Sequence, residues 1–323
     1  MGQVRQRVLR RLRIATAVFV ALTVAGEAHA QTTDSTDTTP PSGGHSAADT
    51  ASNRSGERSL KWYSMFTNIP RDWVRFGQVT FRSKNIPSFV GMTLLTGALV
   101  ATDDETWKMS QRWYGSSNVV ASFSDQFEYV GDGKPQFALS AAFALYGFAK
   151  GDQRALRTAS EIVEAILSCG IVIQVLKHAT GRESPFVSTV PGGRWDLLPN
   201  QIEYHKHVPR YDAYPSGHIA TTLATVTVVA ENYPEWKWVR PVGYAIAAGV
   251  AIGMGNTGIH WYSDYPLGLA IGYMFGMLAA HPEGLPAEQE ESAQQVTVGP
   301  AVSPYGVGVG VTILLNLHQP CAQ

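Results

Sequence analysis

Cysteine and charge are both scarce in this 323-residue chain. The two cysteines, Cys169 in an apolar run and Cys321 near the C-terminus, are too few for a disulfide framework, so we expect a free, buried Cys169. Charged side chains make up 16% of the residues, with 25 basic against 26 acidic ones. No basic stripe breaks that balance, which argues against nucleic acid as a partner.

Metal-binding patterns and long hydrophobic runs are scarce as well. His205 and His207 flank Lys206, but no carboxylate or cysteine stands at a supporting spacing, so the sequence predicts no metal site and no cofactor. The uninterrupted apolar stretches are mostly about 12 to 16 residues long, below the roughly 20 that a spanning helix needs. This favours a soluble or membrane-peripheral domain, with contact to a membrane surface left open.

Both ends of the chain differ in composition from its middle. Residues 1–30 have five arginines, an apolar run over 14–25 and a small-x-small sequence at 28–30, which predicts a secretory signal peptide. We therefore expect a secreted protein of the bacterial periplasm or envelope, with an integral membrane protein as the alternative. Residues 31–58 have almost no large apolar side chains and are expected to be a disordered polar linker. In the tail, 284–323, β-branched residues on both sides of 303–306 predict a β-hairpin.

The middle of the chain, residues 59–283, has the pattern of one helical domain. Apolar segments separated by glycine, proline and charged residues predict helices over 87–101, 136–149, 156–178, 217–231, 239–254 and 265–280. The predicted fold class is all-α, a multi-helix bundle. The glycines of 255–258 favour a tight turn before His260 rather than a helix interior.

Two short motifs in this domain carry chemistry. In the first, Pro215-Ser216-Gly217-His218, Ser216 can cap the following helix, and the free amides of its first turn can bind an anion beside His218. In the second, His260 and Asp264 are four residues apart, so the carboxylate can fix the tautomer of the imidazole. The two histidines therefore suggest a nucleophile and a general acid. Helix capping is the structural alternative for Asp264.

A third block, from Lys177 to Pro185, ends a long apolar segment. Over about residues 85–280, the three ordered blocks resemble the type 2 phosphatidic acid phosphatase superfamily, which includes bacterial acid phosphatases and vanadium haloperoxidases. The resemblance implies a helical bundle of the acid phosphatase/haloperoxidase type and hydrolysis of a small or lipid phosphate ester without metal. It implies that His260 attacks phosphorus to form a phosphohistidine, that Asp264 orients it and that His218 is the general acid. Lys177 and the amides at Ser216 and Gly217 are the implied phosphate ligands.

Two arginines of the superfamily pattern are replaced, by Ser184 and Met254. Arg182, two residues before the first gap, is expected either to bind phosphate in place of the missing arginine or to pair with a carboxylate. Lys206 and Arg210 are further candidate cations. The gaps leave a second interpretation open, a non-catalytic protein that binds phosphate or a lipid headgroup at a degraded site. A third is vanadate-dependent halide oxidation. No sequence feature specifies the oligomeric state.

Overall fold

The computed structural model describes residues 63–82, 85–285, 296–303 and 306–313. The predicted signal peptide and linker lie outside these ranges. The helices are α3 (Ser64–Thr67), α4 (Ile69–Thr80), α5 (Ile86–Val100), α6 (Asp103–Tyr114), α7 (Asn118–Gly131), α8 (Lys134–Lys150), α9 (Gln153–Thr180), α10 (Gln201–Lys206), α11 (Gly217–Asn232), α12 (Val239–Thr257) and α13 (Tyr265–Ala280). Three short 3₁₀ turns interrupt the loops, η2 (Pro185–Val187), η3 (Val208–Arg210) and η4 (Tyr262–Asp264).

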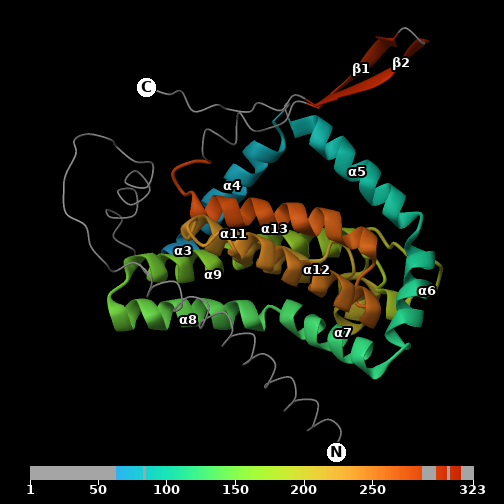
Figure 1. Cartoon of the computed structure of the whole chain (residues 1–323). Coiled ribbons are helices and arrows are strands. Elements are labelled where there is room, and N and C mark those ends of the chain that lie inside the picture. Colours follow the sequence, from blue (N-terminus) through green and yellow to red (C-terminus); the bar gives the residue numbers. More distant parts are fainter. Residues whose placement is uncertain (1–62, 83–84, 286–295, 304–305, 314–323) are drawn as a thin grey trace, which may run out of the picture.

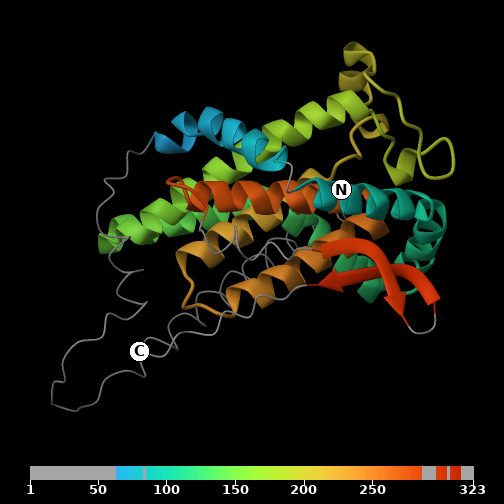
Figure 2. The same ribbon diagram turned by 90° about the horizontal axis from the view of Figure 1, so that it is seen from above.

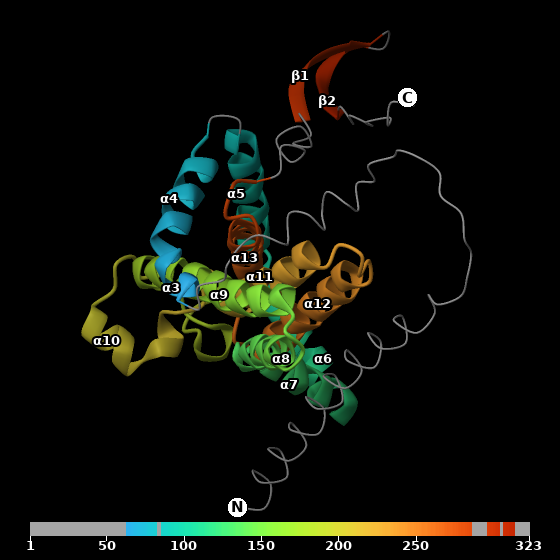
Figure 3. The same cartoon turned by 90° about the vertical axis from the view of Figure 1, so that its left-hand side faces the viewer.

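Helices α9, α11 and α13 pack against one another at the centre, with α8 against α9 and α12 beside α11 (Figures 1 and 3). Buried apolar side chains from all three central helices form the main core cluster, among them Ile162, Ala224 and Phe275. Close approach here requires glycine, because a Cβ at Gly272 would lie 2.2 Å from the carbonyl oxygen of Ala220. The fold is all-α over the helical domain, as predicted, and Cys169 is free and buried.

All six predicted helices are present, with one boundary corrected. Helix α12 continues to Thr257 and ends on Gly258, whose φ of +81° is the left-handed conformation that glycine favours. Residues 255–257, predicted to form a tight turn, are therefore its last helical residues. The apolar pattern did not predict α4, α6, α7 and the shorter helices, because their apolar residues are spread among charged and polar ones.

A long excursion between α9 and α11 holds η2, α10 and η3, and it covers one end of the bundle (Figure 2). It begins at Gly181, which ends α9 with φ +52°, and a Cβ there would lie 2.1 Å from the carbonyl oxygen of Asp196. Only glycine fits this turn without moving the chain. The excursion therefore leaves α9 within the block from Lys177 to Pro185.

Helix α5 has no buried residue, although it carries no charged side chain. Its large exposed side chains include Phe89, Leu94 and Leu95, which are 39%, 68% and 53% exposed. Among the described residues, α9 is long and apolar enough to cross a membrane, although 56% of its apolar window is buried in the bundle. Helices α5 and α6 would make a second candidate if two helices bent by 60° count as one span.

Strands β1 (Val296–Ser303) and β2 (Gly306–Ile313) pair antiparallel and project from the helices in Figure 1. A hairpin as a stable part of the fold stays a prediction, since an isolated two-stranded ribbon is marginal in water.

Candidate active site

The two motif histidines meet directly. Nδ1 of His218, in the first turn of α11, lies 3.0 Å from Nε2 of His260, which precedes η4. Nδ1 of His260 lies 2.7 Å from the carbonyl oxygen of Ala213 and must donate to it, because a carbonyl can only accept. Nε2 of His260 therefore carries a lone pair, and His218 donates to it from Nδ1.

Asp264 lies next to His260 but is not its shortest contact. Its Oδ2 is 3.5 Å from Nδ1 of His260 and 2.7 Å from the backbone nitrogen of Trp261, which donates to it. Its Oδ1 accepts from Arg182 at 2.6 Å. The tautomer of His260 is therefore fixed first by Ala213 and only second by Asp264. Asp264 precedes α13 at the N-cap position, but its side chain makes no capping bond to that helix.

The residues expected to bind phosphate surround the histidine pair. Ser216 is buried, and its Oγ accepts from the amide of Ile219 at 3.5 Å, as the capping prediction requires. The amides of Gly217 and His218 begin α11, where helical N–H groups lack intrahelical acceptors. Lys177, in the last turn of α9, is buried and forms a 3.2 Å salt bridge with Asp212. Its positive charge lowers the pKa of both histidines, so all three side chains form one site.

Burial sets the protonation states. It lowers the pKa of His260 to about 3, with Lys177 adding to the effect. Burial, the neighbouring His260 and Lys177 lower the pKa of His218 well below its usual value. Burial also raises the pKa of Asp264 to about 6, against the opposing charge of Arg182. At neutral pH both imidazoles are neutral and Asp264 is ionised.

Arg182 is fully buried beneath the site. Its Nη1 donates to Asp264 and to Ser263, and its Nη2 donates to Asp103 and to the carbonyl of Gly192, each within 2.7 Å. Of the two roles that the sequence allowed, these contacts favour pairing with carboxylates. Asp264 is one of the partners, which ties Arg182 to the catalytic turn.

The two positions that lack the superfamily arginines are both buried, and neither holds a cation. Ser184 is 2% exposed, and Met254 is 1% exposed within an apolar cluster. A Cβ at Gly131 would lie 3.0 Å from Cε of Met254 and 3.4 Å from Cβ of His218, so the thioether ends close to the histidine pair. Lys206 is exposed and paired with Glu203 on α10.

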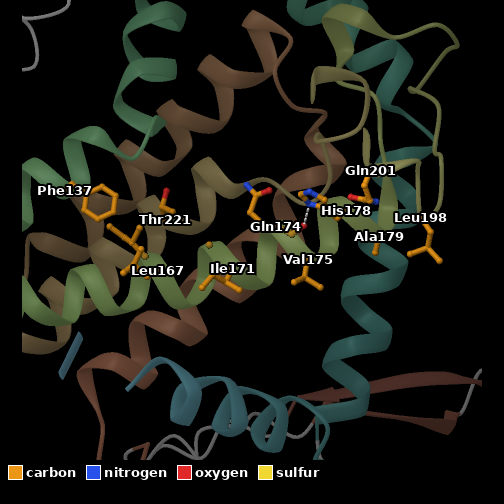
Figure 4. Close-up of a pocket in the computed structure, with 12 residues that line it drawn as sticks. Phe137, Leu167, Ile171, Gln174, Val175, His178, Ala179, Leu198, Gln201 and Thr221 are labelled. Atoms are coloured by element: carbon orange, nitrogen blue, oxygen red, sulfur yellow. Dashed lines mark hydrogen bonds between the residues drawn. The ribbon is translucent and has the colours of Figure 1, made fainter. Parts of the chain in front are cut away.

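An open groove of about 800 Å³ runs beside the site along α9 (Figure 4). It is lined largely by apolar side chains, with Phe137 of α8, Ile171 and Val175 of α9 and Thr221 of α11 among them. Thr221 follows His218 by three residues and donates to its carbonyl oxygen at 3.2 Å. The groove therefore touches α11 about one turn from His218, although the side chains of His218, His260 and Lys177 do not line it.

The three blocks that form the site all fall within one segment that matches a family model. Residues 158–282 match the model of the PAP2 superfamily. Over this segment the chain is similar to the PAP2 superfamily. Asp103, which contacts Arg182, lies outside the matched segment.

Individual proteins are also similar to parts of this chain. A lipid A 1-phosphatase of Porphyromonas gingivalis is 35% identical over 68 residues, which are 21% of this chain but only 15% of the relative's length. Among solved structures, a transmembrane PAP2-type phosphatidylglycerolphosphate phosphatase from Bacillus subtilis is similar at a TM-score of 0.46 and 15% identity, covering 66% of this chain and 99% of that one. LpxE of Aquifex aeolicus follows at 0.40 and 18%, covering 54% and 92%.

Three residues of the site escaped the sequence analysis, namely Asp103, Asp212 and Ala213. Asp212 and Ala213 lie three and two residues before Pro215 of the Pro-Ser-Gly-His motif, so the sequence places them near it, but the carbonyl contact of Ala213 has no side-chain signature. Asp103 is 79 residues from Arg182 and 160 from Ser263, and no local pattern marks it.

Proposed function

We propose that this protein is a phosphatase that hydrolyses a phosphate ester through a phosphohistidine on His260, without using a metal ion. The contact of His218 with His260 is the observation that carries the proposal, because it leaves an oriented lone pair on Nε2 beside a second imidazole. Lys177 and the first-turn amides of α11 supply charge and donors for the phosphate oxygens. Ser216, Gly217 and Asp264 complete the proposed site, and Arg182 supports it through Asp264.

The reaction takes place in two displacements. A bound phosphate brings negative charge that raises the pKa of His218, so this ring takes up a second proton. His218 then shifts its hydrogen bond from Nε2 of His260 to the leaving oxygen. The lone pair of His260 then forms the N–P bond as the P–O bond breaks, and the proton of His218 goes to the leaving group. In the second step, neutral His218 removes a proton from water, the hydroxide attacks phosphorus and the N–P bond breaks.

Release of inorganic phosphate by the purified protein is the direct test. We expect hydrolysis of at least one member of a panel of small phosphomonoesters, diphosphates and phospholipids, and its loss in His260→Ala. His281→Ala is the matched control, because His281 pairs with Glu231 at the end of α13. A wild-type protein that turns over nothing on the panel contradicts the proposal.

We further propose that the substrate is a lipid phosphate and that the protein works at the membrane surface of the bacterial envelope. The groove beside α9 has the apolar lining that an acyl chain needs, and α5 presents an uncharged apolar surface. The similarity to a lipid A 1-phosphatase also supports a lipid substrate. Preference for a lipid phosphate over a soluble ester with the same leaving group tests this part, and equal rates on both would count against it.

A second candidate function is binding without turnover at a site that has lost its cations. Ser184 and Met254, both buried without charge, favour it. If it holds, Ser184→Arg with Met254→Arg should raise activity by orders of magnitude, because each charged hydrogen bond to an oxyanion is worth about 1.5–3 kcal/mol. Met254→Leu is the control for a changed side chain without charge. An active parent that gains nothing from the double substitution rules this candidate out.

A further inference from the structure

Asp103, Arg182 and Asp264 form one buried charge cluster, and all three side chains are fully buried. The guanidinium bridges the two carboxylates at 2.6 Å to each. Ser263 donates to Asp103 and accepts from Arg182, which closes the cluster. A single cation is thus shared between two carboxylates at a place where water cannot substitute for either partner.

Arg182 reaches His260 by two routes. Its side chain holds Oδ1 of Asp264, whose Oδ2 faces Nδ1 of His260 at 3.5 Å. Its backbone carbonyl accepts from the amide of Ala213 at 3.0 Å, and the carbonyl of Ala213 in turn accepts from Nδ1 of His260. Arg182 therefore positions both oxygens that face Nδ1 of His260, the carboxylate of Asp264 and the carbonyl of Ala213.

Asp103 brings a remote part of the chain to this cluster. It is the first residue of α6, separated from the end of α5 by two residues, and its carboxylate contacts both Arg182 and Ser263 of η4. Trp195 and Trp261 lie against the guanidinium, with ring centroids 4.6 Å and 5.2 Å from its carbon. These rings fix Arg182 from the remaining sides.

We infer that Asp103 and Arg182 are positioning residues, which share the charge of Asp264 and so set how strongly this carboxylate acts on His260. The inference deepens the proposed phosphatase function and rests on it for its kinetic test. Arg182 makes no phosphate contact in this account. Asp103 lies outside the matched family segment, but the effect of Asp264 on His260 then depends on it.

The decisive variant is Asp103→Asn. It removes the negative charge of Asp103, so Asp264 is then the one carboxylate of the cluster that pairs with Arg182. The ionised form of Asp264 is therefore favoured, and its pKa, which burial raises to about 6, should fall. The acid limb of kcat/KM against pH should then move down by about one pH unit. The other groups facing Asp264, namely Lys177, His260, Tyr214 and Tyr265, are unchanged in this variant.

Three further variants make the test specific. Asp72→Asn is the matched control, a fully buried aspartate paired with Arg71 of α4, and it should leave the acid limb in place. Ser263→Ala is milder; it removes a donor from Asp103, which then depends more on Arg182, so the limb should shift in the opposite direction and by less. Arg182→Lys keeps the charge but loses the fork, so kcat should fall about tenfold or more with little change in KM, whereas a phosphate ligand would raise KM.

A second readout separates this inference from the proposed function. NMR titration of labelled aspartate carboxyl carbons measures the pKa of Asp264 directly and needs no turnover. A lower pKa in Asp103→Asn than in wild type, with no shift in Asp72→Asn, is the expected result. If wild type is inactive, the proposed function fails, and the titration still decides the inference. An unchanged pKa of Asp264 in both Asp103→Asn and Ser263→Ala overturns it.

Discussion

At the scale of single residues, Asp212 pairs with Lys177, the cation that a bound phosphate needs. Its carboxylate lies 3.2 Å from Nζ of Lys177, and its side chain is 29% exposed, so it stands at the entrance of the site. A substrate oxygen must compete with Asp212 for Lys177. The carboxylate therefore weakens anion binding by repulsion and by occupying the lysine.

Asp212→Asn should consequently bind inorganic phosphate more tightly. Loss of one partly exposed ion pair and its repulsion predicts a product inhibition constant about two- to five-fold lower than in wild type. Competition kinetics measure this constant. Glu203→Gln, which removes an exposed carboxylate from α10, should leave the constant unchanged. Weaker phosphate binding in Asp212→Asn would show that Asp212 serves binding by holding Lys177 in place.

At the scale of elements, a buried carboxyl pair attaches α4 to α9, 13 residues before Lys177 along α9. Glu164 of α9 accepts from Asn68 and lies beside Asp72 of α4, and Arg71 contacts both carboxylates. Burial and the neighbouring Asp72 raise the pKa of Glu164 to about 9. At neutral pH Glu164 is therefore protonated, and its proton serves the oxygen of Asp72 that has no other donor.

This pair makes stability fall as pH rises. The unfolded chain releases the proton of Glu164 near its ordinary pKa of 4.5, whereas the folded protein holds it to about 9, so folding is favoured less and less across that window. Glu164→Gln keeps a donor for Asp72 and should raise the unfolding free energy by about 1–3 kcal/mol at pH 8. Denaturant unfolding at several pH values measures it. The two proteins should be equal near pH 4, and a variant less stable than wild type at pH 8 would contradict the account.

The apolar segments predicted six helices well, because these helices have continuous apolar runs, whether the helix is largely buried, as α13 is, or exposed, as α5 is. Apolar runs did not predict α6 and α7, because these helices contact α12 partly through polar side chains. Gln111 of α6 donates to the carbonyl oxygen of Asn256, and Ser124 of α7 accepts from the side chain of Asn256. The motif spacing predicted the meeting of His218 and His260. The contact of Asp103 with Arg182 could not be predicted, since it depends on where α6 begins in space.

At the scale of the whole molecule, the apolar surface of α5 is the part of the protein that we expect to contact the membrane. A single charge there should weaken binding to lipid vesicles several-fold, because burying a charged group in an apolar phase is unfavourable by several kcal/mol. We expect Leu94→Glu to lower vesicle binding in a flotation assay and to leave the hydrolysis of a small soluble ester unchanged. Val119→Glu, on an equally exposed position of α7, is the control. Equal vesicle binding by both variants and wild type would remove α5 from the membrane contact.

Two parts of the bundle have different roles. The end with α10 gathers Lys177, the histidines and the buried cluster of Asp103, Arg182 and Asp264, while the carboxyl pair of α4 and α9 lies farther along α9. The core between them has few charges. Substitutions at the remote pair should therefore change stability without changing the pH profile of catalysis.

Trapping the covalent intermediate tests the central claim most directly. An activated, radiolabelled aryl phosphate needs no protonation of its leaving group, so His218→Ala should still form the phosphohistidine but hydrolyse it slowly. We predict that label accumulates on this variant to about one phosphate per chain, is stable to alkali and labile to acid, and maps to the peptide that contains His260. It should be absent when His260→Ala is added. Release of phosphate without protein-bound label, or label that persists without His260, would contradict the account.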